Sequence, residues 1–207
     1  MSSIPAYPAL TEKEVAGARL FADRASLIRG LSIPKSGVIA EIGVLRGDFS
    51  EFLISELAPR KFVGFDMFNA HEHASIWGIP SSEFFQGLTQ QEYVQRRLTR
   101  FGDSVALERG PSQRTLPKYA RREFDLVYID AGHDYDDVKS DAHWAAQMAK
   151  DDGILVFNDY ILFDHMAMAP YGIVPVVNRM LVDEGWRVVG FAFQHQLFCD
   201  IAIQRRR

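Results

Sequence analysis

The chain has 207 residues, of which 47% are hydrophobic, and a formal net charge of −4. This length suffices for one well-packed domain and is short for two of ordinary size, so we expect a single domain over residues 1–207. The slightly acidic balance excludes a broad positive field for a phosphate backbone, although three arginines end the sequence. Nucleic acid is therefore not the expected partner.

Cysteine content and terminal sequence bear on location. Cys199 is the one cysteine in the sequence, so no disulfide forms within the chain. The first residues lack the charged and then apolar layout of a signal peptide, and apolar runs fall short of the roughly 20 residues of a membrane span. We expect a cytoplasmic protein that does not enter a membrane.

The first predicted element is an N-terminal helix. Thr11 and Glu14 have the spacing of a capping box, and apolar residues follow at helical intervals. This pattern predicts a helix over residues 11–30 that covers an edge of the domain or a cofactor cleft.

Five short apolar runs then alternate with helical stretches. They occupy residues 38–43, 61–66, 104–109, 124–130 and 153–158. Runs that are apolar on both faces and separated by helices are typical of a buried parallel sheet. Two last runs, 186–193 and 197–204, follow a helix near 173–184 and are close enough in sequence to pair antiparallel. The sequence predicts an α/β, doubly wound (Rossmann-like), mostly parallel seven-stranded sheet with a C-terminal antiparallel hairpin.

A glycine turn ends the first apolar run. Glu41, Gly43 and Gly47 form the pattern Glu-x-Gly-x-x-x-Gly before a helical stretch. Glycines at a strand-to-helix turn let a ligand approach the backbone near the free N–H groups of the helix, which indicates a nucleotide-type cofactor site. The next apolar run ends in Asp66, at the distance where such folds present an acid to ribose hydroxyls. A loop-capping role for Asp66 is the alternative.

Residues 67–100 interrupt the alternation of strands and helices. This stretch is longer than a typical crossover and carries glycine and proline before a helix near 90–100. Long insertions beside a ligand cleft often act as covers, so we interpret it as a lid or substrate cover. Two histidines at 71 and 73 are interpreted as polar loop residues rather than metal ligands.

The fourth and fifth apolar runs each end in oxygen ligands. Asp130 follows one run, and Asn158 and Asp159 follow the other. Because the carboxyl ends of neighbouring parallel strands meet at one edge of the sheet, these side chains can converge on one ion. Carboxylate and amide oxygens suit Mg²⁺ or another hard divalent cation better than zinc.

Taken together, these motifs resemble a known family. The turn from Glu41 to Gly47 is similar to motif I of the class I S-adenosylmethionine (SAM) dependent methyltransferases. Asp130-Ala-Gly-His133-Asp-Tyr, followed by Val-Phe-Asn158-Asp159-Tyr, resembles the metal-dependent O-methyltransferase branch of macrolide-sugar, catechol and caffeoyl-CoA enzymes. The resemblance runs from about residue 35 to the C-terminus. Relatives have Asp at the position of Asn158, so this chain departs there.

The resemblance implies a set of site residues. SAM is the implied cofactor, and Mg²⁺ or another divalent cation is the implied ion. The implied cofactor contacts are Glu41, Gly43, Gly47, Asp66, Gly110, Ser112 and Asp130, with Gly110 and Ser112 beside the adenine. The implied metal ligands are Asp130, Asn158 and Asp159.

Methyl transfer to oxygen needs a hydroxyl held in line with the sulfonium and made anionic. Asp130 and His133 are the catalytic candidates, with His133 as the base. A purely structural role for His133, capping the following helix, is equally open. The expected reaction is SAM-dependent O-methylation of a small hydroxylated molecule, a sugar or phenol.

Three other functions remain open from the sequence. A metal-independent small-molecule methyltransferase would use His133 or another base. An NAD-binding oxidoreductase shares the glycine turn and the ribose acid but normally has Gly-x-Gly-x-x-Gly, which the turn at 43–47 lacks. A non-catalytic nucleotide-binding module is the third alternative. A homodimer is a further expectation.

Overall fold

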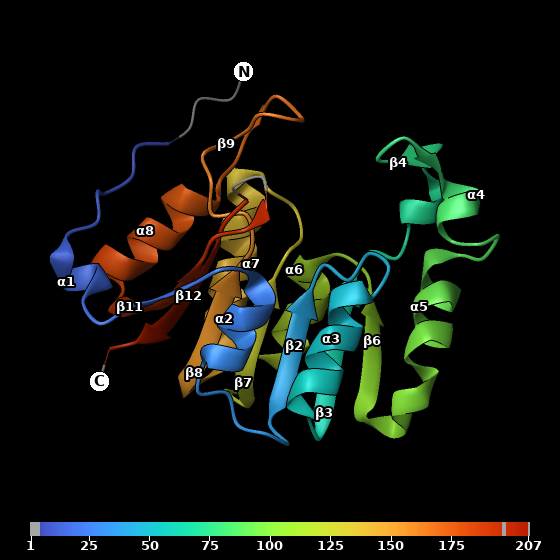
Figure 1. Cartoon of the computed structure of the whole chain (residues 1–207), viewed down its shortest axis with the longest axis horizontal. Coiled ribbons are helices and arrows are strands. Elements are labelled where there is room, and N and C mark those ends of the chain that lie inside the picture. Colours follow the sequence, from blue (N-terminus) through green and yellow to red (C-terminus); the bar gives the residue numbers. More distant parts are fainter. Residues whose placement is uncertain (1–4, 196–197, 207) are drawn as a thin grey trace.

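One large sheet organises the molecule (Figure 1), and the computed structural model describes residues 5–195 and 198–206. In spatial order its strands are β1 (Arg19–Phe21), β11 (Trp186–Ala192), β12 (Asp200–Arg205), β8 (Ala149–Phe157), β7 (Phe124–Ile129), β2 (Val38–Ile42), β3 (Lys61–Asp66) and β6 (Val105–Arg109). Strand β12 runs antiparallel to both its neighbours, and all other pairs are parallel. The mostly parallel sheet with a C-terminal antiparallel hairpin is confirmed.

All seven predicted strands are present among the described residues, and β1 adds an eighth at the edge of the sheet; residue 197, where the last predicted run begins, lies outside the described residues. The prediction of one helix over residues 11–30 was wrong. The segment instead forms α1 (Glu12–Val15), strand β1 and α2 (Arg24–Gly30). The capping box at Thr11 is present, but Gly17 turns the chain with φ of +78°. The next residues then hydrogen-bond along β11, and Asp23 caps a new helix. Sheet pairing replaces helical bonding here.

Helices cover both faces of the sheet, which explains why the strands are apolar on both sides. One face packs against α7 (Tyr135–Met148), α8 (Ile173–Asp183), the short α6 (Ser112–Thr115) and the 3-10 turn η3 (Leu116–Tyr119). The other packs against α2, α3 (Asp48–Leu57) and α5 (Gln90–Leu98). Within β2, Ala40 joins the first core cluster and Ile39 the second. This alternation is the two-residue period of a strand buried on both faces.

Two small hairpins project beyond the ends of the parallel strands (Figure 1). One lies in the insertion 67–100, which contains η1 (Ala70–Glu72), β4 (Ser75–Ile76), β5 (Ile79–Pro80), α4 (Ser81–Phe84) and α5, and it is followed by η2 (Thr99–Ser104). The other follows β8 and consists of β9 (Phe163–Asp164) and β10 (Ala169–Pro170). Helix α5 confirms the helix predicted near 90–100. The covering role of the insertion stays a prediction.

Location and assembly stay expectations. Among the described residues, no helix is both long and apolar enough to cross a bilayer. The single-domain organisation, the cytoplasmic location and the homodimer therefore remain predictions from the sequence.

Candidate functional site

The glycine turn at the end of β2 lies against the end of β7. Gly43 has φ of +91°, and a Cβ placed on it would lie 1.9 Å from the backbone oxygen of Asp130. The Asp130 N–H donates to the carbonyl of Ile42 at 2.8 Å, which holds the two strand ends together. Gly47, with φ of +72°, begins helix α3 in a left-handed conformation. Gly43 is therefore required by both backbone conformation and close packing.

Glu41 is buried beneath this turn. Ser50, on helix α3, donates a hydrogen bond to its carboxyl group. Burial, with a smaller contribution from the negative charge of Asp130, raises the pKa of Glu41 to about 8. Without a ligand, Glu41 is therefore largely protonated at neutral pH.

Asp66 lies beside the turn at the end of β3, and its carboxylate accepts hydrogen bonds from three backbone N–H groups. Val44 and Leu45 donate at 2.8 and 3.0 Å to one oxygen, and Phe68 donates at 2.7 Å to the other. This is the loop-capping geometry that the sequence left open. It also fixes the glycine turn, and the role of Asp66 toward a ribose stays a prediction.

Gly110 and Ser112, implied as adenine contacts, lie next to Asp66. The Gly110 N–H donates to the Asp66 carbonyl at 3.0 Å. Ser112 begins α6, and its side chain hydrogen-bonds the carboxyl group of Asp141 on α7. Asp141 is almost fully buried, and burial raises its pKa to about 6.

Sheet register places the predicted residues in one row. Ile42 pairs with Ile129, which pairs with Phe157, which pairs with Ile201. One position closer to this edge of the sheet lie Gly43, Asp130, Asn158 and Asp200, the last of which precedes Ile201 because β12 runs antiparallel. The convergence predicted from strand ends is therefore a direct result of the register.

Asp130, His133 and Asp159 form an acidic cluster at this edge. One ligand atom from each lies within 4.8 Å of the others. Burial raises the pKa of Asp130 to about 6, and burial together with the charge of Asp130 raises that of Asp159 to about 7. Asp159 adopts φ of +54°, a strained conformation for a residue with a side chain. Two carboxyl groups are thus held close together at a partly exposed edge of the sheet.

His133 lies within this cluster and does not cap a helix. Its Nε2 atom is 3.4 Å from the carboxylate of Asp159 and is buried without a hydrogen bond to any described residue. The imidazole stacks on the ring of Tyr171, with centroids 4.2 Å apart and an interplanar angle of 7°. Asp134, the next residue, is the N-cap of α7. Burial lowers the pKa of His133, which favours the neutral form that accepts a proton or a metal.

Arg24 brings the positive charge to this site. It extends from α2, with its guanidinium 3.7 Å from the Asp130 carboxylate and 4.3 Å from the centroid of Phe49. Its side chain also hydrogen-bonds Tyr128. Sequence reasoning missed Arg24 because nothing in the local pattern of an N-terminal helix indicates contact with a strand end 100 residues away.

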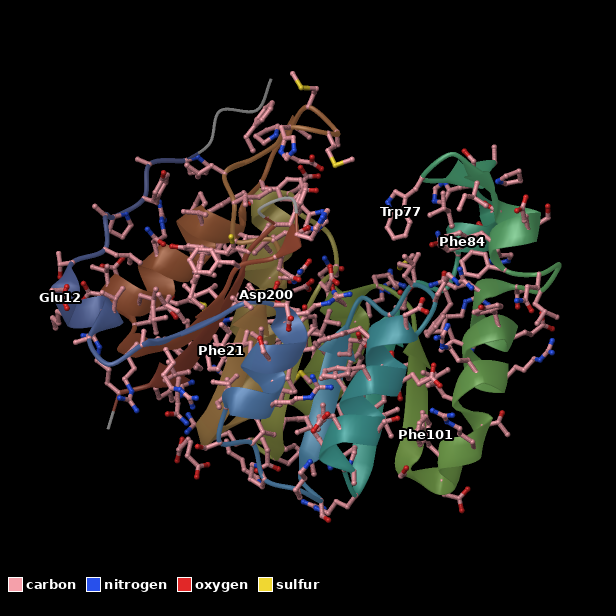
Figure 2. The ribbon with its side chains drawn as sticks, viewed as in Figure 1. Glu12, Phe21, Trp77, Phe84, Phe101 and Asp200 are labelled. Atoms are coloured by element: carbon pink, nitrogen blue, oxygen red, sulfur yellow. The ribbon has the colours of Figure 1, made fainter. Side chains whose placement is uncertain are left out.

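Asp200 is the second residue that the sequence analysis missed. It begins β12, is fully buried and accepts hydrogen bonds from Tyr128, Asn158 and Gln194 at 2.8, 2.8 and 2.7 Å. In Figure 2 it lies centrally, near the ends of the strands. A charged residue within the apolar run 197–204 was the available signal.

The donor set fits a divalent cation. Two carboxylates and a neutral imidazole are near enough to share one ion, and the Nε2 atom of His133 lacks another partner. A cation would also offset burial and the repulsion from Asp130, which together raise the pKa of Asp159. The structure adds His133 to the predicted ligands, and Asn158 sits next to Asp159 with its amide nitrogen bonded to Asp200. Occupancy by Mg²⁺ stays a prediction.

Comparison with known proteins agrees with this geometry. A family model described as a methyltransferase domain matches residues 40–160. No curated protein sequence matches the chain significantly.

Several solved structures share the fold. The O-methyltransferase TomG of Streptomyces achromogenes, solved with SAM, is 18% identical over 88% of this chain and 80% of its own, with a TM-score of 0.64. The Bacillus cereus O-methyltransferase, solved with SAH, is 15% identical over 98% and 84%, with a TM-score of 0.62. An rRNA methylase of Streptococcus thermophilus is 10% identical over 88% and 94%, with a TM-score of 0.60.

The family model covers more than half of the chain, from the strand that carries Glu41 to Tyr160 beyond β8. It therefore contains the glycine turn, Asp66 and the acidic cluster. The neighbouring structures share the overall fold of this chain. This chain belongs to the methyltransferase domain family and has the fold of the class I SAM-dependent methyltransferases.

Proposed function

We propose that this protein transfers the methyl group of SAM to a hydroxyl oxygen of a small molecule, a sugar or phenol, with the help of a divalent cation. The observation that carries the proposal is the acidic cluster of Asp130, His133 and Asp159 directly beside the glycine turn of β2. A cofactor at the turn and an acceptor at the cluster would meet at the same edge of the sheet.

The charges around the glycine turn suit the methionine end of SAM, which carries a carboxylate, an ammonium and a sulfonium. Arg24 offers a guanidinium for the carboxylate, and Asp130, 3.7 Å away, offers an oxygen for a cationic group. The site thus presents both signs of charge to a zwitterionic ligand. The solved complexes of TomG with SAM and of the Bacillus cereus enzyme with SAH support the same cofactor.

Residues of the acidic cluster would hold the ion and the acceptor. Asp130, His133 and Asp159 would bind the cation, with the amide oxygen of Asn158 next to them. A bound divalent cation lowers the pKa of a hydroxyl and orients it. Where no ion is bound, neutral His133 is positioned to take the hydroxyl proton, and Tyr171 holds its ring in place by stacking.

A small-molecule acceptor is favoured over nucleic acid by charge. The chain carries a net charge of −4, and the proposed acceptor site is lined by carboxylates, which repel a phosphate backbone. Neighbours of the fold include the rRNA methylase of Streptococcus thermophilus, so a nucleic acid acceptor belongs among the tests.

Calorimetric titration with SAM and with NAD, in EDTA and then with Mg²⁺, tests the cofactor. We expect micromolar SAM binding and no NAD binding. NAD binding without SAM binding would overturn the proposal in favour of an oxidoreductase, and SAM binding without turnover of any acceptor would favour a non-catalytic module.

Methyl transfer from labelled SAM to catechols, hydroxylated sugars and RNA tests the reaction. We expect transfer to a small hydroxylated molecule that EDTA abolishes and Mg²⁺ restores. Transfer that EDTA leaves unchanged would identify a metal-independent enzyme. Transfer to RNA alone would refute the small-molecule proposal.

A further inference from the structure

Asn158 stands at the strand end where the next residue, Asp159, joins the acidic cluster. Its side-chain amide has an NH₂ donor on one side and an oxygen acceptor on the other. The oxygen can bind a metal ion only if the amide is rotated so that the oxygen faces the ion. The amide nitrogen donates to Asp200 at 2.8 Å, and no donor among the described residues reaches the amide oxygen.

Asp200 fixes the orientation of the Asn158 amide. A carboxylate only accepts hydrogen bonds, so the side of the Asn158 amide that faces it must be the nitrogen. Asp200 cannot turn away easily, because Tyr128 donates to its other oxygen at 2.8 Å and Gln194 donates to the shared one at 2.7 Å. These two donors come from different segments of the chain and hold the carboxylate on both sides.

The sheet places this pair in register. Phe157 on β8 pairs with Ile201 on β12, so Asn158 and Asp200 face each other one step further toward the edge. Asp200 is fully buried, and Asn158 is 8% exposed. A hydrogen bond between neighbouring strands in a dry environment is rigid and costly to break.

We propose that Asp200 is a positioning residue for the metal site, which turns the amide oxygen of Asn158 toward the ion held by Asp130 and Asp159. It acts through Asn158 and does not touch the ion itself. The inference rests on the divalent cation of the proposed function and adds a residue from β12 that neither sequence motif contains.

Mn²⁺ affinity, measured by electron paramagnetic resonance of the free ion, tests this without any turnover. Asp200→Leu keeps the size of the side chain but removes the acceptor, so the Asn158 amide loses its fixed direction. We expect Mn²⁺ binding to weaken by about tenfold or more, the usual effect of losing a residue that orients a metal ligand. Asp200→Asn retains an acceptor oxygen toward Asn158, and its Mn²⁺ affinity should stay within about threefold of the unaltered protein.

Tyr128→Phe removes one of the two donors that hold Asp200 and leaves the bond to Asn158 in place, so its Mn²⁺ affinity should fall by less than that of Asp200→Leu. The proposal is overturned if Asp200→Leu binds Mn²⁺ normally, if Asp200→Asn loses as much as Asp200→Leu, or if the unaltered protein binds no Mn²⁺. Normal SAM binding by each variant would show that the fold and the cofactor site are intact. Failure of the unaltered protein to bind SAM would refute the proposed function, independently of the role of Asp200.

A second measurement remains decisive if Asp200→Leu does not fold. The side-chain amide signals of Asn158 in a nitrogen–proton NMR spectrum are identified by their absence in Asn158→Asp. In the unaltered protein they should exchange slowly with water and stay protected when Mg²⁺ is added, since the nitrogen keeps its bond to Asp200. Fast exchange, or loss of protection on adding Mg²⁺, would contradict the proposed orientation.

Discussion

Glu41→Gln is expected to remove a pH-dependent loss of stability. In the folded protein the pKa of Glu41 is about 8, raised mainly by burial, against 4.5 for an exposed glutamate. The protonated form is therefore the one that the fold stabilises. As the pH rises from 4.5 toward 8, the unfolded chain releases this proton first, and the folded state loses stability relative to it.

The size of the effect follows from the two pKa values. The difference between 4.5 and about 8 corresponds to about 4 to 5 kcal/mol when the glutamate is fully ionised above pH 8. Glutamine cannot ionise and retains an oxygen to accept the hydrogen bond from Ser50. The Glu41→Gln variant should thus match the unaltered protein near pH 4.5 and exceed it by several kcal/mol at pH 9.

Urea denaturation, followed by circular dichroism at a series of pH values between 4.5 and 9, measures the difference. Asp130 and Asp159 are present in both proteins, so the comparison isolates Glu41 together with its repulsion from Asp130. Glu12→Gln, at an exposed position in α1, is the control for removing a carboxyl group from the surface. A constant difference for Glu41→Gln across the range would refute the argument that burial holds this group protonated.

Gly43→Ala should destabilise the protein by about 3 kcal/mol or more, because the added Cβ would overlap the Asp130 backbone. Gly17→Ala, at similar φ but with open space around it, should cost only about 1 kcal/mol in the same urea titration, and equal losses would refute the packing argument. Asp159→Asn should raise the thermal unfolding midpoint at pH 8 in the absence of divalent ions, and it should weaken Mn²⁺ binding. A lowered midpoint would show that Asp159 and Asp130 do not repel each other. Trp77→Ala, at an 81% exposed side chain that packs edge-on against Phe84, should change stability by less than about 0.5 kcal/mol yet raise the KM for the acceptor at unchanged SAM affinity. An unchanged KM would contradict the interpretation of residues 67–100 as a substrate cover.

Local patterns in the sequence were sufficient for every strand of the large sheet except β1. Strands buried on both faces must be apolar at consecutive positions, so the seven runs were visible without any knowledge of contacts. The glycine turn and the oxygen ligands at strand ends were visible for a similar reason, because the carboxyl ends of parallel strands necessarily share one edge. Asp130 and Asp159 were found in this way, and the structure brings them together with His133.

Tertiary structure decided what local pattern cannot encode. Strand β1 was read as helix because its three residues are extended only through pairing with β11, which lies far along the chain. Arg24 and Asp200 belong to the site because α2 and β12 pack beside β7 and β8, and nothing near either residue in sequence specifies that contact. The direction of the Asn158 amide depends on Asp200, 42 residues away. Residue types and periodicity determined the elements and the edge where chemistry gathers, whereas long-range packing determined which charges meet there, because a hydrogen bond depends on distance in space rather than along the chain.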